Sequence, residues 1–152
     1  MTLHEIMSKL ILIIGVKIFV QVVACVLKRK NRILISLRPK GKEFSGYYEF
    51  PGGKVKKGEL FLESLSRELL EELGVRINLN RVIFLESYKI IKKKRKLNLN
   101  FFFCPNWSGQ IKNMEGQKFK WVLIDELNCS DLLESNKRFV NYLSFIFFPT
   151  SN

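Results

Sequence analysis

Histidine and cysteine are scarce in this sequence, and both shortages limit the chemistry that it can support. His4 is the only histidine, which excludes Ser-His-Asp triads and His-rich zinc sites near a folded core. The three cysteines, Cys25, Cys104 and Cys129, are odd in number, far apart and without any C-x-x-C pair. This usage gives no disulfide framework and fits a reducing compartment, so we expect a cytoplasmic protein. Any catalysis must then rest on carboxylates, arginine, lysine, asparagine and metal.

Acidic residues are also few relative to basic ones. The chain has 14 Asp and Glu against 26 Lys and Arg, a formal net charge of +12 over 152 residues. Such a balance attracts polyanions, which include nucleotides, nucleic acid and anionic membranes. A compositional drift towards Lys, Asn, Ile and Phe explains the same excess equally well, so the charge by itself selects no partner.

The longest apolar run is interrupted by charge and does not predict a membrane span. Residues 10–27 approach the roughly 20 residues that a span needs. Lys17 lies near the middle of this run, at a cost of about 2.5–3.5 kcal/mol for insertion. We therefore predict that residues 16–27 form a first core strand and that no membrane is a partner. The length predicts one domain, placed at 17–148, after an N-terminal extension at 1–16 that forms a short helix or an extra strand.

The most informative stretch runs from residue 49 to residue 75 and is typical of a loop followed by a helix. Pro51-Gly52-Gly53 cannot be helical, and its glycines let the backbone pass close to a ligand. Residues 60–73 lack Gly and Pro, and Leu at 62, 65, 69 and 73 forms a helical stripe. Gly74 follows at the position of a C-terminal cap. The pattern therefore predicts a helix over 60–73.

The same predicted helix carries three carboxylates, Glu68, Glu71 and Glu72, on one face. Their spacings of three and four residues make them neighbours, and like charges so placed destabilise an isolated helix. A hard cation removes this conflict, because Mg²⁺ and Mn²⁺ prefer carboxylate, carbonyl and water oxygens. The alternative is an acidic face that is simply solvated.

The remaining segments predict an alternation of strands and helices. We expect a second hairpin strand at 32–37, a long hairpin from 82–91 and 97–104 with a basic tip at 92–96, a strand at 119–124, and a closing helix capped by Ser130 or Asp131 and ending near Phe147. A basic tip is a solvated face by default, and contact with phosphate or nucleic acid is the alternative. The pattern predicts an α/β or α+β domain.

The order of residues in the loop and helix resembles the Nudix box of the Nudix hydrolase family. Gly53, five residues, Glu59, seven residues and then Arg67-Glu68-Leu69-Leu70-Glu71-Glu72-Leu73-Gly74-Val75 fit every defining position of the box. The resemblance implies an α/β/α sandwich with a curved mixed sheet and two main helices. It also implies hydrolysis of a nucleoside diphosphate linked to another moiety, with Mg²⁺, or Mn²⁺ in its place, held by the box glutamates.

Beyond the box, the chain resembles the MutT type, which converts 8-oxo-dGTP to 8-oxo-dGMP and pyrophosphate and so limits mutation. Arg38 stands where that type has its phosphate-binding arginine, and Asn136 where it has the asparagine that reads the purine base. Arg95 matches an arginine near the base. Glu49-Phe50-Pro51-Gly52 resembles the segment that lines the nucleotide pocket. The implied substrate is a free nucleoside triphosphate, with no stable nucleic-acid partner and a monomeric enzyme.

The resemblance also implies roles for individual residues in the metal site. The Gly52 carbonyl and the carboxylates of Glu68, Glu71, Glu72 and Glu115 are the expected ligands, with Glu72 as the most direct. Glu71, Glu68 and Glu115 all remain candidates for the base that deprotonates water. Arg67 is expected to support the glutamates through charge-assisted hydrogen bonds, and Glu59 to orient the loop or to join the metal ligands.

The sequence departs from the MutT pattern in two respects that concern specificity. Glu43 stands where the pattern has a histidine, and the basic tip at 92–96 is denser than the pattern. Two alternatives therefore stay open. One is a Nudix hydrolase of another nucleotide or of an RNA 5′ end, which the +12 charge favours. The other is a non-catalytic nucleotide-binding module, which has no need of three box glutamates.

Overall fold

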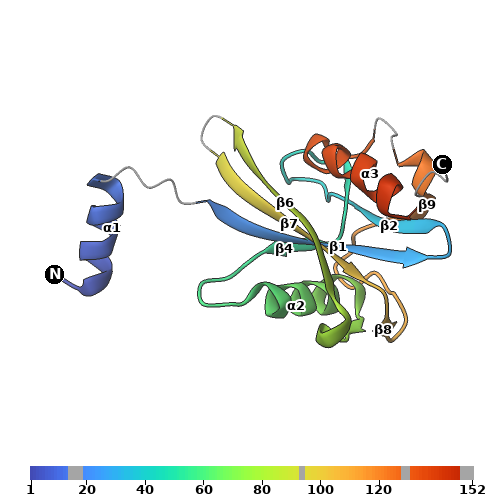
Figure 1. The fold of residues 1–152 in the computed structure, drawn as a ribbon, viewed down its shortest axis with the longest axis horizontal. Coiled ribbons are helices and arrows are strands. Elements are labelled where there is room, and N and C mark those ends of the chain that lie inside the picture. The colour runs from blue at the N-terminus through green and yellow to red at the C-terminus, as the bar shows by residue number, and fades with distance from the viewer. Residues whose placement is uncertain (14–18, 93–94, 128–130, 148–152) are drawn as a thin grey trace.

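One long strand, β1 (Val20–Arg29), lies at the centre of the fold. The computed structural model describes residues 1–13, 19–92, 95–127 and 131–147 (Figure 1). The strands that follow β1 are β2 (Arg32–Leu37), β3 (Tyr48–Glu49), β4 (Gly52–Lys54), β5 (Arg76–Ile77), β6 (Ile83–Lys92), β7 (Arg95–Cys104), β8 (Trp107–Ser108) and β9 (Phe119–Leu123). The helices are α1 (Leu3–Ile13), α2 (Phe61–Leu73) and α3 (Glu134–Phe147), with short 3-10 turns η1 (Leu79–Arg81) and η2 (Ile124–Glu126).

Seven of the strands form one mixed sheet. Its order is β3-β2-β1-β7-β6, with β4 pairing to β1 and β9 pairing to β2. β1 and β7 run parallel, with Val20 beside Leu97 and Leu27 beside Cys104, and the other pairs are antiparallel. β5 and β8 form a separate two-stranded ribbon. The predicted α/β class with a mixed sheet is confirmed.

The alternating side chains of β1 face two separate hydrophobic clusters. Val23, Cys25 and Leu27 belong to the cluster that contains the leucines of α2. Ala24 and Val26 belong to the cluster that contains the apolar residues of α3. Because successive side chains of a strand point to opposite faces, one strand supplies both cores. Figure 1 shows the result, with α2 on one side of the sheet and α3 on the other.

The helix α2 forms where the leucine stripe predicts it. Leu65, Leu69 and Leu73 are buried against the sheet. Its first turn is closed by Glu63, whose carboxylate accepts a hydrogen bond from the backbone N–H of Leu60 at 2.9 Å. It ends at Gly74, which adopts φ 69° and donates to the carbonyl of Leu70 at 3.0 Å. This left-handed conformation costs glycine little and other residues more, so the predicted cap is confirmed.

The closing helix begins later than predicted, and the proposed cap at Asp131 is wrong. α3 starts at Glu134, because the residues before it are bound to β3 instead. The Tyr48 N–H donates to the Asp131 carbonyl at 2.7 Å, and the Leu133 N–H donates to the Tyr48 carbonyl at 2.8 Å. Leu132 thereby forms a parallel bridge with Tyr48 in an extended conformation. The other proposed cap, residue 130, lies outside the described residues.

Two further strand predictions agree in place and differ in length. The first core strand was expected over 16–27; β1 runs from Val20 to Arg29, and residues 16–18 lie outside the described residues. The long hairpin is confirmed as β6 and β7, each of which reaches closer to the tip than predicted. Residues 93 and 94 of the basic tip lie outside the described residues.

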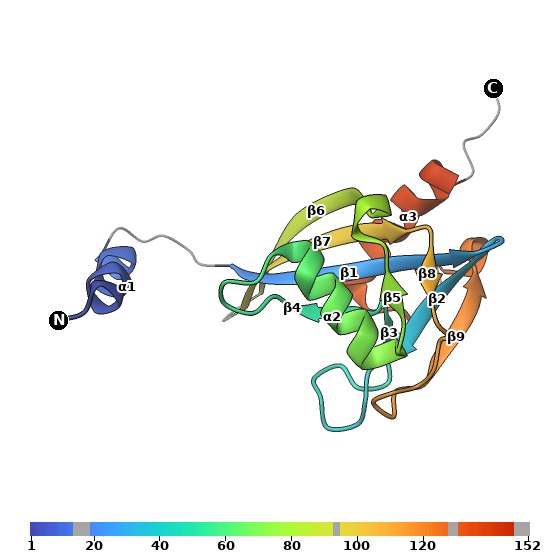
Figure 2. The same cartoon turned by 90° about the horizontal axis from the view of Figure 1, so that it is seen from below.

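The N-terminal extension contains a helix, which was one of its two expected forms. α1 covers Leu3–Ile13 and carries its own cap, since Glu5 accepts a hydrogen bond from the Thr2 N–H at 2.7 Å. Figure 2 shows α1 set apart from the sheet and its two covering helices. None of the helices in the described ranges is long and apolar enough to cross a membrane.

Candidate active site

Two glycines bring the loop before α2 into contact with both β1 and α2. A Cβ on Gly52 would lie 2.0 Å from the Val23 carbonyl oxygen, and the residue adopts φ 151°. A Cβ on Gly53 would lie 2.4 Å from Oε1 of Glu68. Neither contact is possible for a real side chain, so these positions allow the loop to pass between the strand and the Glu68 carboxylate.

Arg67 joins this loop to the helix through Glu59. Its Nε donates to Oε1 of Glu59 at 2.7 Å, and its Nη2 donates to Oε2 at 3.0 Å, a two-pronged pairing. The same carboxylate accepts a hydrogen bond from the Lys56 N–H at 2.8 Å. The hydrogen bond with Arg67, followed by that from Lys56, lowers the pKa of Glu59 to about 2. Glu59 therefore contacts both the loop and Arg67, and its two expected roles, to orient the loop or to join the metal ligands, stay predictions.

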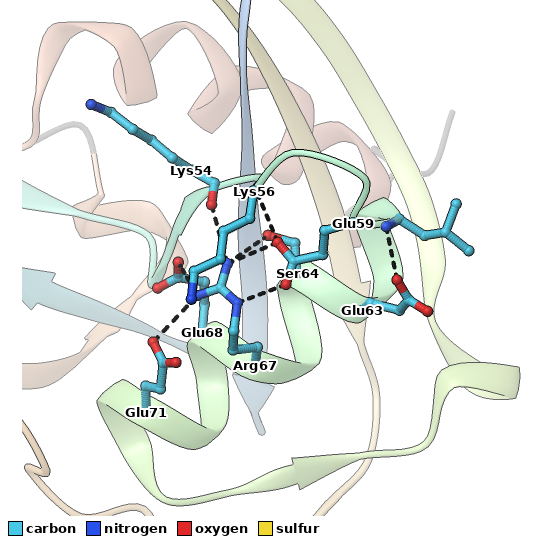
Figure 3. Close-up of polar contacts among 9 residues, drawn as sticks. Lys54, Lys56, Glu59, Glu63, Ser64, Arg67, Glu68 and Glu71 are labelled. Atoms are coloured by element: carbon cyan, nitrogen blue, oxygen red, sulfur yellow. Dashed lines mark hydrogen bonds and ion pairs between the residues drawn. The ribbon is translucent and has the colours of Figure 1, made fainter.

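The rest of the Arg67 guanidinium faces the other carboxylates of α2 (Figure 3). Nη1 donates to Glu68 at 2.8 Å and to Glu71 at 3.3 Å. Nη2 also reaches the Lys54 carbonyl at 3.2 Å and the hydroxyl of the buried Ser64 at 3.3 Å. Pairing with Glu59 and then Glu68 raises the pKa of Arg67 above its ordinary value. One fixed cation thus holds three glutamates and the loop together.

Glu72 contacts the loop at Gly52. The Gly52 N–H donates to Oε2 of Glu72 at 3.2 Å. Burial raises the pKa of Glu72 to about 8, and the negative charges of Glu68, Glu49 and Glu115 add to this rise. The Glu72 carboxylate is therefore repelled by three other carboxylates around the same loop.

Glu115 reaches this group because its loop caps the C-terminal end of α2. The Lys112 N–H donates to the Leu73 carbonyl at 2.9 Å, and the Met114 N–H donates to the Glu72 carbonyl at 3.1 Å. These bonds satisfy carbonyls that the last turn of a helix leaves without partners. Met114 also covers Gly74, where an added Cβ would lie 3.2 Å from the sulfur.

Arg38 and Glu49 form a partly buried ion pair beside the same carboxylates. Nη1 of Arg38 lies 2.6 Å from Oε2 of Glu49, and its Nε donates to the Glu43 carbonyl at 2.9 Å. Burial raises the pKa of Glu49, and Arg38 opposes that rise. The expected phosphate-binding arginine is therefore engaged with a carboxylate of the same site.

Phe50 and Asn136 meet inside the protein. The ring of Phe50 is 3% exposed and packs edge-on against Phe101 and Phe139 at 5.8 Å between centroids. Asn136 is also buried, and its Oδ1 accepts a hydrogen bond from the Phe50 N–H at 3.0 Å. Its Nδ2 donates to the hydroxyl of Ser135 at 3.2 Å. A hydrogen bond between the Phe50 backbone and the Asn136 side-chain amide thus joins the two expected pocket residues.

Pro51 fastens the site loop to β1, whereas Arg95 is paired with a residue of another loop. The Pro51 carbonyl accepts a hydrogen bond from the Cys25 N–H at 2.8 Å, which fastens the loop to β1. Arg95 forms an ion pair with Glu43, in the loop that follows Arg38. The structure therefore places Arg95 beside Glu43, the residue that stands where the pattern has a histidine.

Sequence reasoning missed several contributors to this arrangement. Ser64 and the Lys54 carbonyl both hold Arg67, and the backbone of Lys112 and Met114 positions Glu115. Ser64 had a usable signal, because a residue three positions before an arginine shares its helix face. The backbone groups carried no signal, since they depend on a loop that folds back from distant sequence.

The site contains oxygen donors of the type that a hard dication prefers. In the ranges that the structure describes, no three or more His, Cys, Asp and Glu side chains are grouped closely enough to hold a metal ion. The donors themselves nevertheless fit one: mutual repulsion with Glu68 helps to raise the pKa of Glu72, and a dication would relieve it. A Cβ on Gly53 would enter the space beside the Glu68 carboxylate, so this glycine keeps that space free of a side chain.

Comparisons with known proteins agree with this geometry. The model of the NUDIX domain matches residues 18–143. An 8-oxo-dGTP diphosphatase of Buchnera aphidicola subsp. Schizaphis graminum (strain Sg) is 35% identical over 130 residues, which is 86% of this chain and 97% of that protein. A CTP pyrophosphohydrolase of Escherichia coli (strain K12) is 31% identical over 107 residues, covering 70% and 78%.

Solved structures show the same similarity. The solution structure of the E. coli ORF135 protein has a TM-score of 0.76 and 26% identity, covering 90% of this chain and 98% of that one. A structure from work on MutT of Aliivibrio salmonicida and Vibrio cholerae has a TM-score of 0.71 and 29% identity, covering 82% and 95%. The chain therefore belongs to the Nudix family, as a MutT-like Nudix hydrolase that acts on phosphoanhydride bonds.

Proposed function

We propose that this protein is a Mg²⁺-dependent nucleoside triphosphate pyrophosphohydrolase that converts 8-oxo-dGTP to 8-oxo-dGMP and pyrophosphate, and so limits mutation. The observation that carries the proposal is the set of box carboxylates held around the Gly52-Gly53 loop by Arg67. Relatives named 8-oxo-dGTP diphosphatase support the choice of substrate. We further propose a cytoplasmic monomer whose hydrolase domain spans 17–148.

Nudix hydrolases generally need a divalent metal, usually Mg²⁺. In this chain the Gly52 carbonyl and the carboxylates of Glu68, Glu71, Glu72 and Glu115 would hold it. When bound, such an ion neutralises phosphoryl oxygens and makes a bound water more acidic. Mn²⁺ has the same preference for oxygen donors and is expected to substitute.

The chain's own residues prepare the site for a polyphosphate. Arg67 fixes the orientation of Glu68 and Glu71 through its rigid fork, so both carboxylates need little reorganisation when substrate arrives. Arg38 presents a guanidinium that can exchange the Glu49 carboxylate for a phosphate oxygen of the substrate. Removal of a proton from the attacking water falls to Glu68, Glu71 or Glu115, and the pH-rate profiles of the three Gln variants distinguish these candidates.

Recognition of the base is assigned to Asn136 with Phe50 and Arg95. The Asn136 amide offers both a donor and an acceptor, which suits the edge of an oxidised guanine. Its Oδ1 already accepts the Phe50 N–H, so its Nδ2 is the group that remains for a base acceptor once Ser135 is released. The Phe50 N–H fixes the orientation of the Asn136 amide, while the Phe50 ring packs in the hydrophobic core.

The test is a comparison of kcat/KM for 8-oxo-dGTP, dGTP, CTP, dCTP and a 5′-triphosphorylated RNA, each with Mg²⁺. We expect 8-oxo-dGTP to be preferred over dGTP by about a hundredfold, or roughly 2.7 kcal/mol of transition-state binding. CTP is included because one relative is a CTP pyrophosphohydrolase. Preference for CTP or for the RNA would overturn the sanitising role while keeping the hydrolase. Binding without turnover would identify a nucleotide-binding module.

A further inference from the structure

The helix α1 presents an apolar stripe to solvent. At about 100° per residue, Leu3, Ile6, Met7 and Leu10 fall within an arc of roughly 100°. These four side chains are between 39% and 78% exposed. His4, Glu5 and Lys9 lie outside this arc in the first two turns, and Ile11, Leu12 and Ile13 follow them in the sequence of the last turn. An exposed apolar stripe of this kind is unfavourable in water, and a surface that covers it would stabilise the helix.

The end of the sheet from which α1 is connected is strongly basic. We call it the basic end and define it by five lysines that contribute charge there: Lys54, Lys56, Lys57, Lys89 and Lys96. All of these except Lys96 are exposed, and Lys96 is half-buried. Figure 1 shows the β6–β7 hairpin, the loop before α2 and the start of β1 at the same end of the molecule as α1.

Strand register explains why these lysines gather around the start of β1. β1 and β7 run parallel with Val20 beside Leu97, so Lys96 lies next to the residue that precedes β1. In β4, Lys54 lies beside Val22, so the loop that follows leads away past the same end. Lys89 Nζ lies 5.0 Å from the centroid of the Phe19 ring, which ties β6 to the segment that comes from α1.

Acidic side chains at this end are already engaged. Glu59 is paired with Arg67, Glu63 caps the first turn of α2, and Glu43 is paired with Arg95. The lysines of the basic end are therefore not neutralised by these carboxylates. A positive field and an exposed apolar stripe lie at one end of the same molecule.

We propose that α1 and the basic end together form a docking surface for an anionic lipid bilayer. The apolar stripe of α1 lies in the headgroup boundary, and the lysines face the negative surface of the leaflet. An amphipathic helix with these features binds in the plane of the interface, and basic residues add attraction to anionic lipid. The helix has 11 residues, or about 16 Å, so it lies on the bilayer and does not cross it.

The apolar stripe is the reason to favour lipid over nucleic acid. A phosphate backbone would be satisfied by the lysines alone and would leave Leu3, Ile6, Met7 and Leu10 in water. Single-stranded nucleic acid is usually bound by aromatic side chains on which bases stack, and Phe19, the ring recorded against a lysine of the basic end, is already covered by Lys89. The proposal departs from the expectation that no membrane is a partner, and it is independent of the proposed hydrolase activity.

The test is co-flotation of the full chain with vesicles of phosphatidylcholine, either alone or with about a third of phosphatidylglycerol. We expect binding only to the anionic vesicles, and weaker binding as salt screens the lysines. The double variant Ile6→Gln with Leu10→Gln should bind about tenfold more weakly, because it removes the centre of the stripe. Lys56→Gln with Lys57→Gln should lose about fivefold for each lysine that faces the leaflet.

Matched controls separate this surface from a general effect of charge. His4→Gln alters the polar face of α1, and Lys30→Gln with Arg32→Gln removes two charges at the β1–β2 turn, the opposite end of β1. Both should bind vesicles as the wild type does. No flotation with anionic vesicles overturns the proposal, and so does equal flotation of the Ile6/Leu10 variant. Binding of single-stranded RNA that needs Lys56 and Lys57 but not Ile6 and Leu10, without vesicle binding, would make this a nucleic-acid surface instead.

Discussion

The backbone N–H of Gly52 donates a hydrogen bond to the Glu72 carboxylate at 3.2 Å, which joins the loop of the site to the last turn of its helix. Burial and neighbouring carboxylates raise the pKa of Glu72 to about 8, so this single donor does not offset the cost of its charge. The site is therefore electrostatically strained around one glutamate. Relief of that strain by a bound dication is the central physical claim of the proposed function.

Gly53→Ala should disable the site without unfolding the protein. The added Cβ would lie 2.4 Å from Oε1 of Glu68, so the carboxylate must move from its place beside Arg67. We expect kcat/KM to fall by about tenfold or more and the half-saturating Mg²⁺ concentration to rise. Gly58→Ala is the control, because it lies in the same loop at φ 78° with nothing within 4 Å of its added Cβ. Equal loss in both variants would show that the effect is one of backbone strain.

Arg67→Lys should be far from conservative. A lysine has no fork with which to bind Glu59 in two-pronged fashion while also reaching Glu68. We expect a loss of about 2 kcal/mol in the free energy of unfolding and a fall of at least a hundredfold in kcat. Chemical denaturation and steady-state kinetics measure the two effects. Arg81→Lys, at an exposed position, should change neither.

The pairing of Glu59 with Arg67 should make stability depend on pH in the acid range. The folded-state pKa of Glu59 is about 2, below the ordinary value of 4.5 for this carboxyl. A depressed carboxyl pKa stabilises the folded state above the unfolded pKa, and this contribution is lost as pH falls from 4.5 towards 2. The gap in Tm between wild type and Glu59→Gln should therefore be widest near pH 6 and should shrink by pH 3. A gap that is constant with pH would contradict the assignment.

Gly74→Ala should loosen the loop that places Glu115. Alanine is strained at φ 69°, and its Cβ would lie 3.2 Å from the Met114 sulfur. We expect a loss of about 1–2 kcal/mol in the free energy of unfolding, together with a weaker response to Mg²⁺. Gly116→Ala provides the comparison, since it has φ 77° and nothing within 4 Å of its added Cβ. It should lose stability only, with the Mg²⁺ response intact.

Local sequence signals predicted much of this fold, because the features concerned depend on neighbouring residues. The leucine stripe of α2 and the cap at Gly74 are set by spacing and by the φ that glycine allows. The start of α3 could not be predicted in this way. Leu132 and Leu133 fit a helical stripe, yet hydrogen bonds with Tyr48, some 84 residues earlier, hold this segment extended.

The same contrast between features set by neighbouring residues and features set by distant residues applies to the site. Glu68, Glu71 and Glu72 share a helix face because of their spacing, so their proximity was predictable. Only the resemblance to a family implied that Glu115 joins these glutamates, and nothing in the sequence indicated that Glu49 raises the pKa of Glu72. The engagement of Asn136 with the Phe50 N–H depends on packing between α3 and the sheet, which no spacing expresses.

The most direct test of the account is 8-oxo-dGTP hydrolysis by Glu72→Gln at saturating Mg²⁺. Glutamine keeps an acceptor for the Gly52 N–H but removes the charge that would bind the cation. We predict a fall in kcat of about a thousandfold or more, with a metal-free Tm equal to or above that of the wild type, because the buried group at position 72 can no longer carry a charge. Activity near that of the wild type would contradict the claim that Glu72 holds the metal on which hydrolysis depends.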